Sequence, residues 1–263
     1  MIRSLCCLAL IALLSGAGLS SPAFAQSQDK ITVFAAASLT EAFNAAAAAF
    51  TKKTGIAVTF SYGGSDTLAT QIKQGAPVDV FASANLKQMQ IVSDAGLVAG
   101  TPKTFVKNRL VLISPKADAK KFASPADLAK PRTKVVLAAA TVPVGGYARA
   151  TFGKLNGTNG YPADFAAAVE KNVVSNELDV KAVVTKISLG EGDAGVVYST
   201  DVTATVEPKL NVLPFPSSVA PDIEYPIATL KNAPNAKGAQ AFVDYILSPE
   251  GQAFLKARGF ISP

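Results

Sequence analysis

The feature that most constrains the fold is a repeated alternation between short apolar runs and longer segments with helical patterning. Apolar runs of strand length lie at 31–37, 56–61, 78–83, 109–114, 135–139 and 194–198, with further candidates at 211–214 and 225–230. Helical patterns lie at 39–53, 66–74, 86–95, 146–155, 165–171, 178–187, 236–246 and 249–258, and Ser124-Pro125 opens a short helix. This alternation predicts an α/β fold in which helices cover both faces of mostly parallel sheet.

Local signals support several of these boundaries. Gly55 and Gly75 are placed to end the first two helices, and the last helix has Ser248 as a candidate N-cap and Gly259 just beyond its end. No internal repeat and no low-complexity linker divides the sequence. If the chain forms two lobes, it must therefore cross between them through ordinary strands, and 107–110 and 214–221 are the candidate crossings.

Two counts exclude several kinds of chemistry. The 263 residues contain no histidine, which excludes Ser-His-Asp and Cys-His catalysis and zinc held by imidazole. The two cysteines, Cys6 and Cys7, are adjacent and cannot form a four-thiolate site. The formal charge of +6 weakly suggests an anionic partner, but the basic residues are not interleaved with aromatic ones, so we expect no nucleic-acid binding.

The first 25 residues have the pattern of an export signal. Arg3 precedes an apolar stretch at 5–19, which is shorter than the roughly 20 residues that span a bilayer, and Ala23-Phe24-Ala25 fits a small-x-small cleavage site. The alternative is an N-terminal membrane anchor. A lipoprotein would need cysteine after the cleavage site, where this chain has Gln26. We expect a soluble, periplasmic protein, made of residues 26–263 and free of cysteine.

Small or hydroxyl residues stand where helices are expected to begin, and each case has an ordinary explanation. Ser38, three residues before Glu41, is typical of a capping box, although its hydroxyl and the nearby N–H groups could also face an anion. Gly63 and Gly64 precede Ser65, and glycines follow Val144 in the sequence VPVGGYA; each pair fits either a plain turn or a close approach to a ligand.

Two further positions are equally ambiguous. Glu177 and Asp179 precede Val180 at the start of a predicted helix, where acidic residues ordinarily complement the helix dipole. Because both carboxylates would repel a bound anion, we expect them to point away from it. Tyr198 ends the run AGVVY and, taken alone, fits the edge of a core better than a ligand contact. No serine has a nearby candidate base, and the acidic residues form no obvious catalytic pair.

Specific strings resemble those of one known family. KITVFAAASLTEAF (30–43), GGSDTLATQIKQGAPVDVFASAN (63–85), VPVGGYA, LDVKAVVTKISLGEGDAGVVYSTD and SPEGQAFLKARGF occur in the order found in periplasmic molybdate-binding proteins, the receptors of molybdate ABC transporters. The resemblance covers nearly the whole chain after residue 25. Receptors for tungstate and sulfate share the architecture.

The resemblance implies a type II periplasmic-binding-protein fold with two lobes, two hinge crossings and an oxyanion in the cleft. The lobes would be 26–107 plus 218–263 and 108–217. Carried over residue by residue, the ligand contacts are the hydroxyls of Ser38, Ser65 and Tyr198 and the backbone N–H groups of Val144 and Val180. Ala37 would line the pocket. These residues would touch the molybdenum centre only through its oxygens, and no other metal and no cofactor is implied.

The function implied by this resemblance is capture of molybdate, and of tungstate too, by a monomeric receptor that delivers it to a membrane ABC permease. The nearest alternative is a receptor for another tetrahedral oxyanion such as sulfate. A more distant one is an exported serine hydrolase using Ser38 or Ser65, which the lack of histidine argues against. A third is a structural or adhesive envelope domain.

Overall fold

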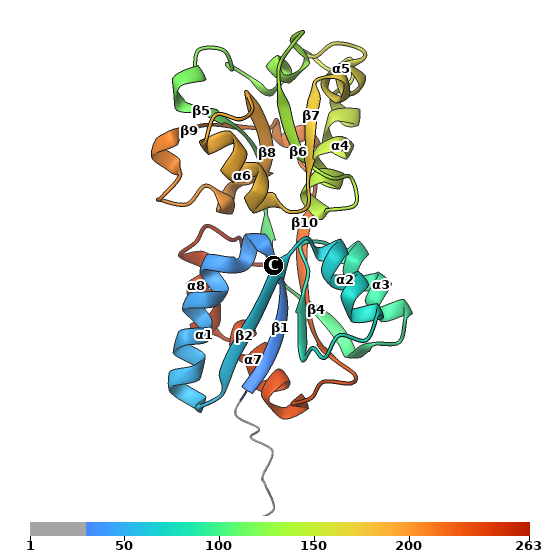
Figure 1. Cartoon of the computed structure of the whole chain (residues 1–263), viewed down its shortest axis with the longest axis vertical. Coiled ribbons are helices and arrows are strands. Elements are labelled where there is room, and N and C mark those ends of the chain that lie inside the picture. Colours follow the sequence, from blue (N-terminus) through green and yellow to red (C-terminus); the bar gives the residue numbers. More distant parts are fainter. Residues whose placement is uncertain (1–29) are drawn as a thin grey trace, which may run out of the picture.

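The computed structural model describes residues 30–263, which form two lobes stacked end to end (Figure 1). The predicted export signal and both cysteines lie outside this range. Each lobe contains one five-stranded sheet, with strand orders β2-β1-β3-β10-β4 and β7-β6-β8-β5-β9. We call the first sheet with its helices lobe 1 and the second sheet with its helices lobe 2. The predicted α/β class is thereby confirmed.

Lobe 1 has helices on both faces of its sheet, and the side chains of the interior strand β1 alternate between two cores. Ile31 and Val33 on β1 belong to the core shared with α1 and α7, whereas Phe34 packs into a separate cluster with Leu68 and Met89 of α2 and α3. The elements are β1 (Lys30–Ala36), the 3-10 helix η1 (Ala37–Leu39), α1 (Thr40–Thr54), β2 (Ala57–Gly63), α2 (Ser65–Lys73), β3 (Val80–Ala82), α3 (Leu86–Asp94), β4 (Val98–Asn108), β10 (Ile223–Leu230), α7 (Ala236–Leu247) and α8 (Pro249–Lys256).

Lobe 2 repeats this arrangement, with α6 on one face of its sheet and α4 on the other (Figure 1). Its fully buried strands β6 and β8 lie at the centre, and the apolar side of α6 packs on them through residues at the predicted helical spacing. The elements are β5 (Leu110–Pro115), η2 (Lys116–Asp118), η3 (Pro125–Ala129), β6 (Val135–Ala138), α4 (Pro143–Leu155), α5 (Phe165–Lys171), β7 (Val173–Glu177), α6 (Val180–Ser188), β8 (Ala194–Tyr198), η4 (Ser199–Asp201), η5 (Glu207–Lys209), β9 (Leu210–Pro214) and η6 (Ser217–Val219).

The chain passes between the sheets at two places. It leaves lobe 1 after β4 and enters β5 two residues later, and it returns between β9 and β10. The strands that follow the crossings, β5 and β10, run antiparallel to both of their neighbours, while β1, β2 and β3 are parallel to one another, as are β6, β7 and β8. Each sheet is thus mixed, with one reversed strand where the chain enters from the other lobe.

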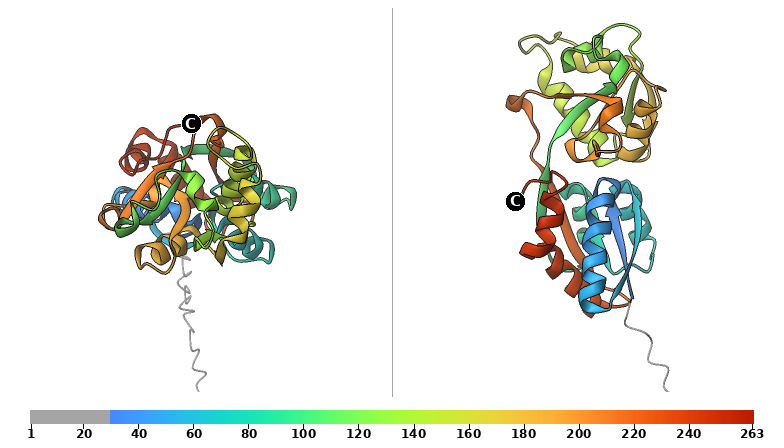
Figure 2. Two further views of the ribbon diagram at one scale, coloured as in Figure 1. Left: turned by 90° about the horizontal axis from the view of Figure 1, so that it is seen from above. Right: turned by 90° about the vertical axis from the view of Figure 1, so that its left-hand side faces the viewer.

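A third segment joins the two crossings at the waist of the molecule. Ile261, near the C-terminus, exchanges two backbone hydrogen bonds with Lys107, at 2.7 and 3.0 Å, and the ring of Phe260 packs edge-on against Tyr225 of β10. Figure 2 shows the C-terminal end beside the connection between the lobes. Within residues 30–263, no helix has the length and hydrophobicity needed to cross a membrane.

Two strands were absent from the sequence prediction. β4 contains Gly100 and Pro102, which resemble turn signals, and β7 has the sequence VVSNE, in which partly buried and exposed residues alternate. Both are edge strands of their sheets, and an edge strand needs neither a continuous apolar run nor a donor at every position. The hydrophobic pattern of these two segments was therefore too weak to predict a strand.

Candidate binding site

A small pocket lies between the two lobes, where the ends of several strands and the beginnings of several helices meet. It holds about 210 Å³ of empty space. Drug-sized ligands occupy pockets of roughly 300–1,000 Å³, so this one suits a much smaller solute. Its walls are formed by Ala36, Ala37, Ser38, Gly63, Gly64, Ser65, Ala84, Val142, Pro143, Val144, Asp179, Val180 and Tyr198.

All five residues proposed from the sequence lie on the walls of this one pocket, together with Ala37. Ser38 and Ser65 come from lobe 1, while the other three come from lobe 2. Residues that the sequence argument did not name also line it, notably Ala84, which follows β3, and Pro143, which begins α4. Ala84 stands two residues after the end of a buried apolar strand, a placement that could have drawn attention to it.

Ser38 does not have the capping role that its spacing from Glu41 suggested. It lies inside η1, and α1 begins at Thr40 with Leu39 as its N-cap and no side-chain cap. The Ser38 hydroxyl is instead 3.0 Å from the hydroxyl of Tyr225, and the Glu41 carboxylate contacts Lys181. The capping-box interpretation is wrong because a turn of 3-10 helix intervenes between β1 and α1, which moves the start of α1 past Ser38.

Ser65 is the first residue of α2, after the N-cap residue Gly64. Its Oγ atom accepts a hydrogen bond from the backbone N–H of Ala84 at 3.0 Å, and the side chain is buried. Because a backbone N–H can only donate, this contact leaves the Ser65 hydroxyl proton free for another acceptor. Gly64 is required here, since a Cβ atom would lie 2.5 Å from the carbonyl oxygen of Leu178 in lobe 2.

The helices that begin at the pocket leave backbone N–H groups without a side-chain cap. Neither α2 nor α4 has a side-chain cap, whereas α3 is capped by Asn85 and α8 by Ser248. In α4, Pro143 occupies the first position and has no N–H, so Val144 carries the first donor of that helix. An uncapped helix start of this kind favours an anion.

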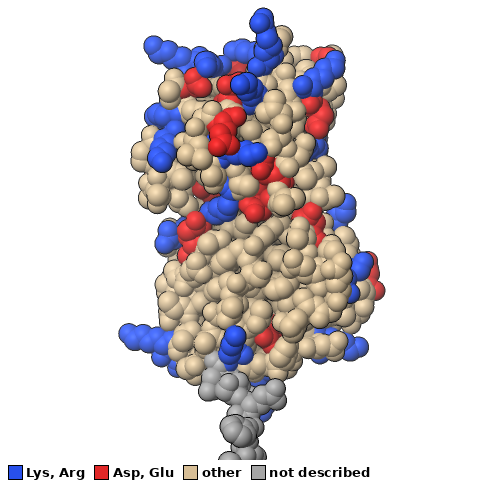
Figure 3. Space-filling model, viewed as in Figure 1, with Lys and Arg blue, Asp and Glu red and all other residues tan. Residues whose placement is uncertain are grey.

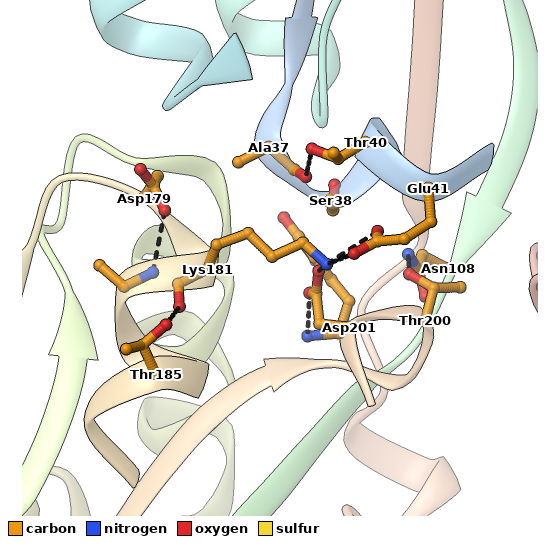
Figure 4. A network of polar contacts seen from close by, with 12 residues as sticks. Ala37, Ser38, Thr40, Glu41, Asn108, Asp179, Lys181, Thr185, Thr200 and Asp201 are labelled. Atoms are coloured by element: carbon orange, nitrogen blue, oxygen red, sulfur yellow. Dashed lines mark hydrogen bonds and ion pairs between the residues drawn. The ribbon is translucent and has the colours of Figure 1, made fainter. Parts of the chain in front are cut away.

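The start of α6 has a partial cap that leaves its first donor available. The Asp179 side chain accepts from the N–H of Ala182 at 3.0 Å, so the cap does not occupy the N–H of Val180. Asp179 nevertheless is among the residues that line the pocket. Its carboxylate is held at the helix start by the Ala182 bond (Figure 4). Glu177 does not line the pocket and pairs with Lys186 at 2.7 Å.

Tyr198 brings a buried hydroxyl into the pocket without a bonding partner. The residue is 1% exposed, and among residues 30–263 its Oη atom has no hydrogen-bond partner at normal geometry. Burial, together with the nearby Tyr225, raises the pKa of Tyr198 well above its usual value, so the hydroxyl keeps its proton. A buried unpaired hydroxyl costs about 1–3 kcal/mol, which a ligand acceptor would recover.

No lysine or arginine is among the residues that line the pocket. Charges of both signs gather instead at the boundary between the lobes, while much of the visible face of lobe 1 is uncharged (Figure 3). The described part of the chain also contains no cluster of three histidine, cysteine or acidic residues that could hold a metal ion. Asp66, next to Ser65, is not on the pocket wall, and its Oδ1 atom is buried without a partner among the described residues.

An ion-pair network spans the lobes beside the pocket (Figure 4). The ammonium group of Lys181 on α6 contacts both carboxylate oxygens of Glu41 on α1, at 2.8 and 2.9 Å. It also lies 3.6 Å from Oδ1 of Asp201, which is within ion-pair range but too long for a hydrogen bond. The other oxygen of Asp201 accepts from the N–H of Tyr198. Burial raises the pKa of Asp201 to about 7, although Lys181 opposes the shift.

Taken together, the two lobes enclose a small site whose polar atoms mostly donate hydrogen bonds. Three hydroxyls and the starts of several helices converge on it, and no cation and no nucleophile–base pair is present on its walls. These features define a two-lobe binding protein for a small anionic solute. The sequence profile of the bacterial extracellular solute-binding protein family matches residues 31–261, and the chain belongs to that family.

Named relatives and solved structures agree with this assignment. The chain is 36% identical over 260 residues to the molybdate-binding protein ModA of Mycobacterium tuberculosis, covering 97% of this chain and 95% of that protein. It is 33% identical to ModA of Escherichia coli, with 89% of each covered. The periplasmic molybdate-binding protein of Azotobacter vinelandii has the same fold, with a TM-score of 0.75 at 23% identity over 89% of this chain and 99% of that one.

Proposed function

We propose that this protein is an exported receptor that captures molybdate in the pocket between its lobes and delivers it to an ABC permease. Similarity along 97% of the chain to proteins named as molybdate-binding supports the choice of ligand. The observation that carries the proposal is the composition of the pocket, where Ser38, Ser65 and Tyr198 supply hydroxyls, Val144 and Val180 supply backbone N–H groups, and no cation is present.

Neutral donors are sufficient to hold a dianion. A hydrogen bond to a charged group contributes roughly 1.5–3 kcal/mol, so several of them together give tight binding without lysine or arginine. The uncapped starts of α2 and α4 add the favourable end of two helix dipoles. The ligand's oxygens make these contacts, and the protein provides no direct ligand to the molybdenum atom.

A pocket made mainly of donors also discriminates among anions. Molybdate and tungstate are fully deprotonated at neutral pH and accept hydrogen bonds at every oxygen. Hydrogen phosphate would bring a donor of its own and leave protein donors unpaired, a mismatch that costs binding energy. We therefore expect tungstate to bind as well as molybdate and phosphate to be rejected.

A receptor for sulfate is the second candidate. The chain is 29% identical to the sulfate-binding protein of a Synechocystis strain, in a match that covers 79% of this chain and 65% of that protein. Its fold matches that of the sulfate-binding protein SubI of M. tuberculosis with a TM-score of 0.77. Sulfate has the same charge and shape as molybdate, so only the size of the pocket can separate them. The molybdate-binding relatives are more similar in sequence, which favours molybdate.

The remaining parts of the proposal concern setting and partners. The predicted export signal at 1–25 would place the protein in the periplasm, where we expect a monomer with no cofactor and no catalytic activity. Ser38 and Ser65 are poor candidates for a nucleophile, because their buried oxygens contact Tyr225 and Ala84 and neither has a base beside it. Closing of the lobes around the anion would give the permease a distinct surface to recognise.

Isothermal titration of the mature protein with molybdate, tungstate and sulfate tests the proposal. We expect tight one-to-one binding of molybdate and tungstate and much weaker binding of sulfate. Sulfate binding as tight as that of molybdate would favour the second candidate, and absence of heat with all three anions would remove the oxyanion assignment.

A further inference from the structure

A buried chain of hydrogen bonds runs from the first crossing to the pocket. The side-chain nitrogen Nδ2 of Asn108, the last residue of β4, donates to Thr200 Oγ1 at 2.8 Å and to the Tyr225 hydroxyl at 3.2 Å. The Tyr225 hydroxyl is 3.0 Å from Ser38 Oγ. These four residues come from β4, β10, η1 and η4, and all are at most 7% exposed.

The orientation of the Asn108 amide is fixed by its neighbours. Its Oδ1 atom accepts from the backbone N–H of Arg109 at 2.8 Å, and a backbone N–H has no acceptor capacity. Ser199 Oγ also donates to this oxygen, at 3.3 Å. The NH₂ group must therefore be the end that faces Thr200 and Tyr225.

This orientation determines where the Tyr225 proton goes. The phenol oxygen already receives the Asn108 N–H, and Ser38 Oγ is the one acceptor among the described residues that meets normal hydrogen-bond geometry with it. The Tyr198 hydroxyl is also nearby but does not meet that geometry. If Ser38 donated to Tyr225, the phenol proton would be buried without an acceptor, which costs about as much as a lost hydrogen bond. Burial raises the pKa of Tyr225 well above its usual value, so the proton is present to be donated.

We propose that Asn108 and Tyr225 are positioning residues that direct the hydroxyl proton of Ser38 into the pocket. Tyr225 donates to Ser38 Oγ and occupies the lone pair that would otherwise face the ligand, so the remaining Ser38 proton points to the anion. The inference rests on the proposed function, because it requires that Ser38 contact a bound oxyanion.

Ser65 offers an internal parallel. Its oxygen accepts from the N–H of Ala84, a donor that does not depend on any side chain, and its proton is likewise left for the ligand. In both serines of lobe 1 the oxygen thus accepts a hydrogen bond from the protein and the proton is left for the ligand, but the donor differs. Ser38 depends on Tyr225, whereas Ser65 does not, and this difference supplies a matched control.

A double-mutant cycle read by molybdate titration tests the proposal. Tyr225→Phe is expected to weaken molybdate binding by about 5–10-fold when Ser38 is intact and by less than about twofold in the Ser38→Ala background, because the Tyr225 hydroxyl acts through Ser38. In the Ser65→Ala background, the same change should keep its full effect of about 5–10-fold.

A second variant guards against a folding defect. Asn108→Ala removes the donor that orients the Tyr225 hydroxyl, and its effect on molybdate affinity should also shrink in the Ser38→Ala background. Thermal unfolding of each protein without ligand reports any loss of fold separately from affinity. A merely structural role at the crossing would weaken binding equally in the presence and absence of the Ser38 hydroxyl.

The outcomes separate the inference from the proposed function. A selective loss that requires Ser38 supports both. Equal losses in all three backgrounds overturn the positioning role, and if Ser38→Ala itself still weakens binding, the proposed function stands. If the wild-type protein binds no molybdate, or Ser38→Ala binds it as tightly as the wild type, Ser38 is not a ligand contact and the inference falls as well.

Discussion

The two walls of the pocket present donors of different kinds. Lobe 1 uses the side-chain hydroxyls of Ser38 and Ser65, whose oxygens contact Tyr225 and the N–H of Ala84. Lobe 2 uses the backbone at the starts of α4 and α6, with the Tyr198 hydroxyl as its one side-chain donor among the lining residues. The lobe 1 wall therefore depends on residue identity, while the lobe 2 wall depends on how closely its helices pack.

The largest expected effect comes from moving a lobe 2 helix. A Cβ atom at Gly145 would lie 2.2 Å from the carbonyl oxygen of Ala139 and 2.3 Å from that of Ala138, so Gly145→Ala must displace the start of α4. We expect molybdate affinity to fall about 10–100-fold, with a destabilisation of about 1–3 kcal/mol. Titration and urea unfolding measure the two effects.

Gly153→Ala is the matched control in the same helix. Nothing lies within 4 Å of a Cβ atom at Gly153, and the substitution should leave affinity unchanged while raising stability by about 0.5–1 kcal/mol. Equal effects of the two substitutions on affinity would mean that the position of the α4 start does not matter for binding.

Truncating a side chain should weaken binding at Ser38 in lobe 1 but not at Val180 in lobe 2, which binds through its backbone. Ser38→Ala is expected to weaken molybdate binding by about 1–3 kcal/mol through the lost hydroxyl. Val180→Ala keeps the backbone N–H and should change affinity by less than about threefold. Titration of both variants makes the comparison, and a similar loss for each would contradict the assignment of backbone donors to lobe 2.

Tyr198→Phe tests the one hydroxyl that lobe 2 contributes. Because the hydroxyl is buried and unpaired by hydrogen bonds within the described residues, its removal should leave the stability of the empty protein unchanged or raise it by about 1 kcal/mol. Affinity for molybdate should nevertheless fall by about tenfold. Thermal unfolding without ligand measures the stability, and titration with molybdate measures the affinity. A loss of stability in the ligand-free variant would mean that the Tyr198 hydroxyl has a partner in the empty protein.

The smallest expected effect is a dependence of protein stability on pH, caused by the buried carboxyl group of Asp201 in lobe 2. Asp201 has its pKa raised from 3.8 to about 7, so between these values the folded protein holds a proton that the unfolded chain has released. Stability should therefore fall as the pH rises through this window and level off above it. Burial keeps the pKa of Tyr225, behind Ser38, well above this window, so that hydroxyl adds no slope of its own.

Asp201→Asn should flatten this pH dependence. Urea unfolding at several values between about pH 4 and about pH 8 compares the variant with the wild type. An unchanged slope in the variant would assign the effect to another group. Because Lys181 also pairs with Glu41 across the lobes, Glu41→Gln serves as the control for a general loss of the network.

Much of the fold was predictable because its signals are local. The apolar runs of the central strands and the glycine that ends α1 at Gly55, which has the positive φ of +78°, can be recognised without knowledge of the partners. The site was harder, because Ser38 followed by Glu41 satisfies the rule for a capping box equally well. The decisive contact is with Tyr225, 187 residues further along the chain, and no local pattern encodes it.

Tyr198 and Asp179 are two pocket residues whose surroundings could not be predicted from the sequence. The sequence alone fitted Tyr198 to the edge of a core, and only the packing around it shows a hydroxyl without a partner among the described residues. The Asp179 carboxylate was expected to point away from a bound anion; it accepts from the N–H of Ala182, and the residue is also among those that line the pocket. For Tyr198 long-range packing decides the outcome, whereas for Asp179 a contact only three residues along the chain does.

The C-terminal pairing has a mechanical consequence. Asn108 pairs with Ile223 at the end of the β4–β10 ribbon, and Ile261 forms a single antiparallel bridge with Lys107 at the same end. Backbone that is hydrogen-bonded on both sides resists a change of dihedral angles, so we expect a pivot between the lobes to lie at Arg109 and the segment 215–222 rather than within β4. If lobe 2 rotates relative to lobe 1, the last few residues of the chain would thereby set where along the crossings that rotation takes place.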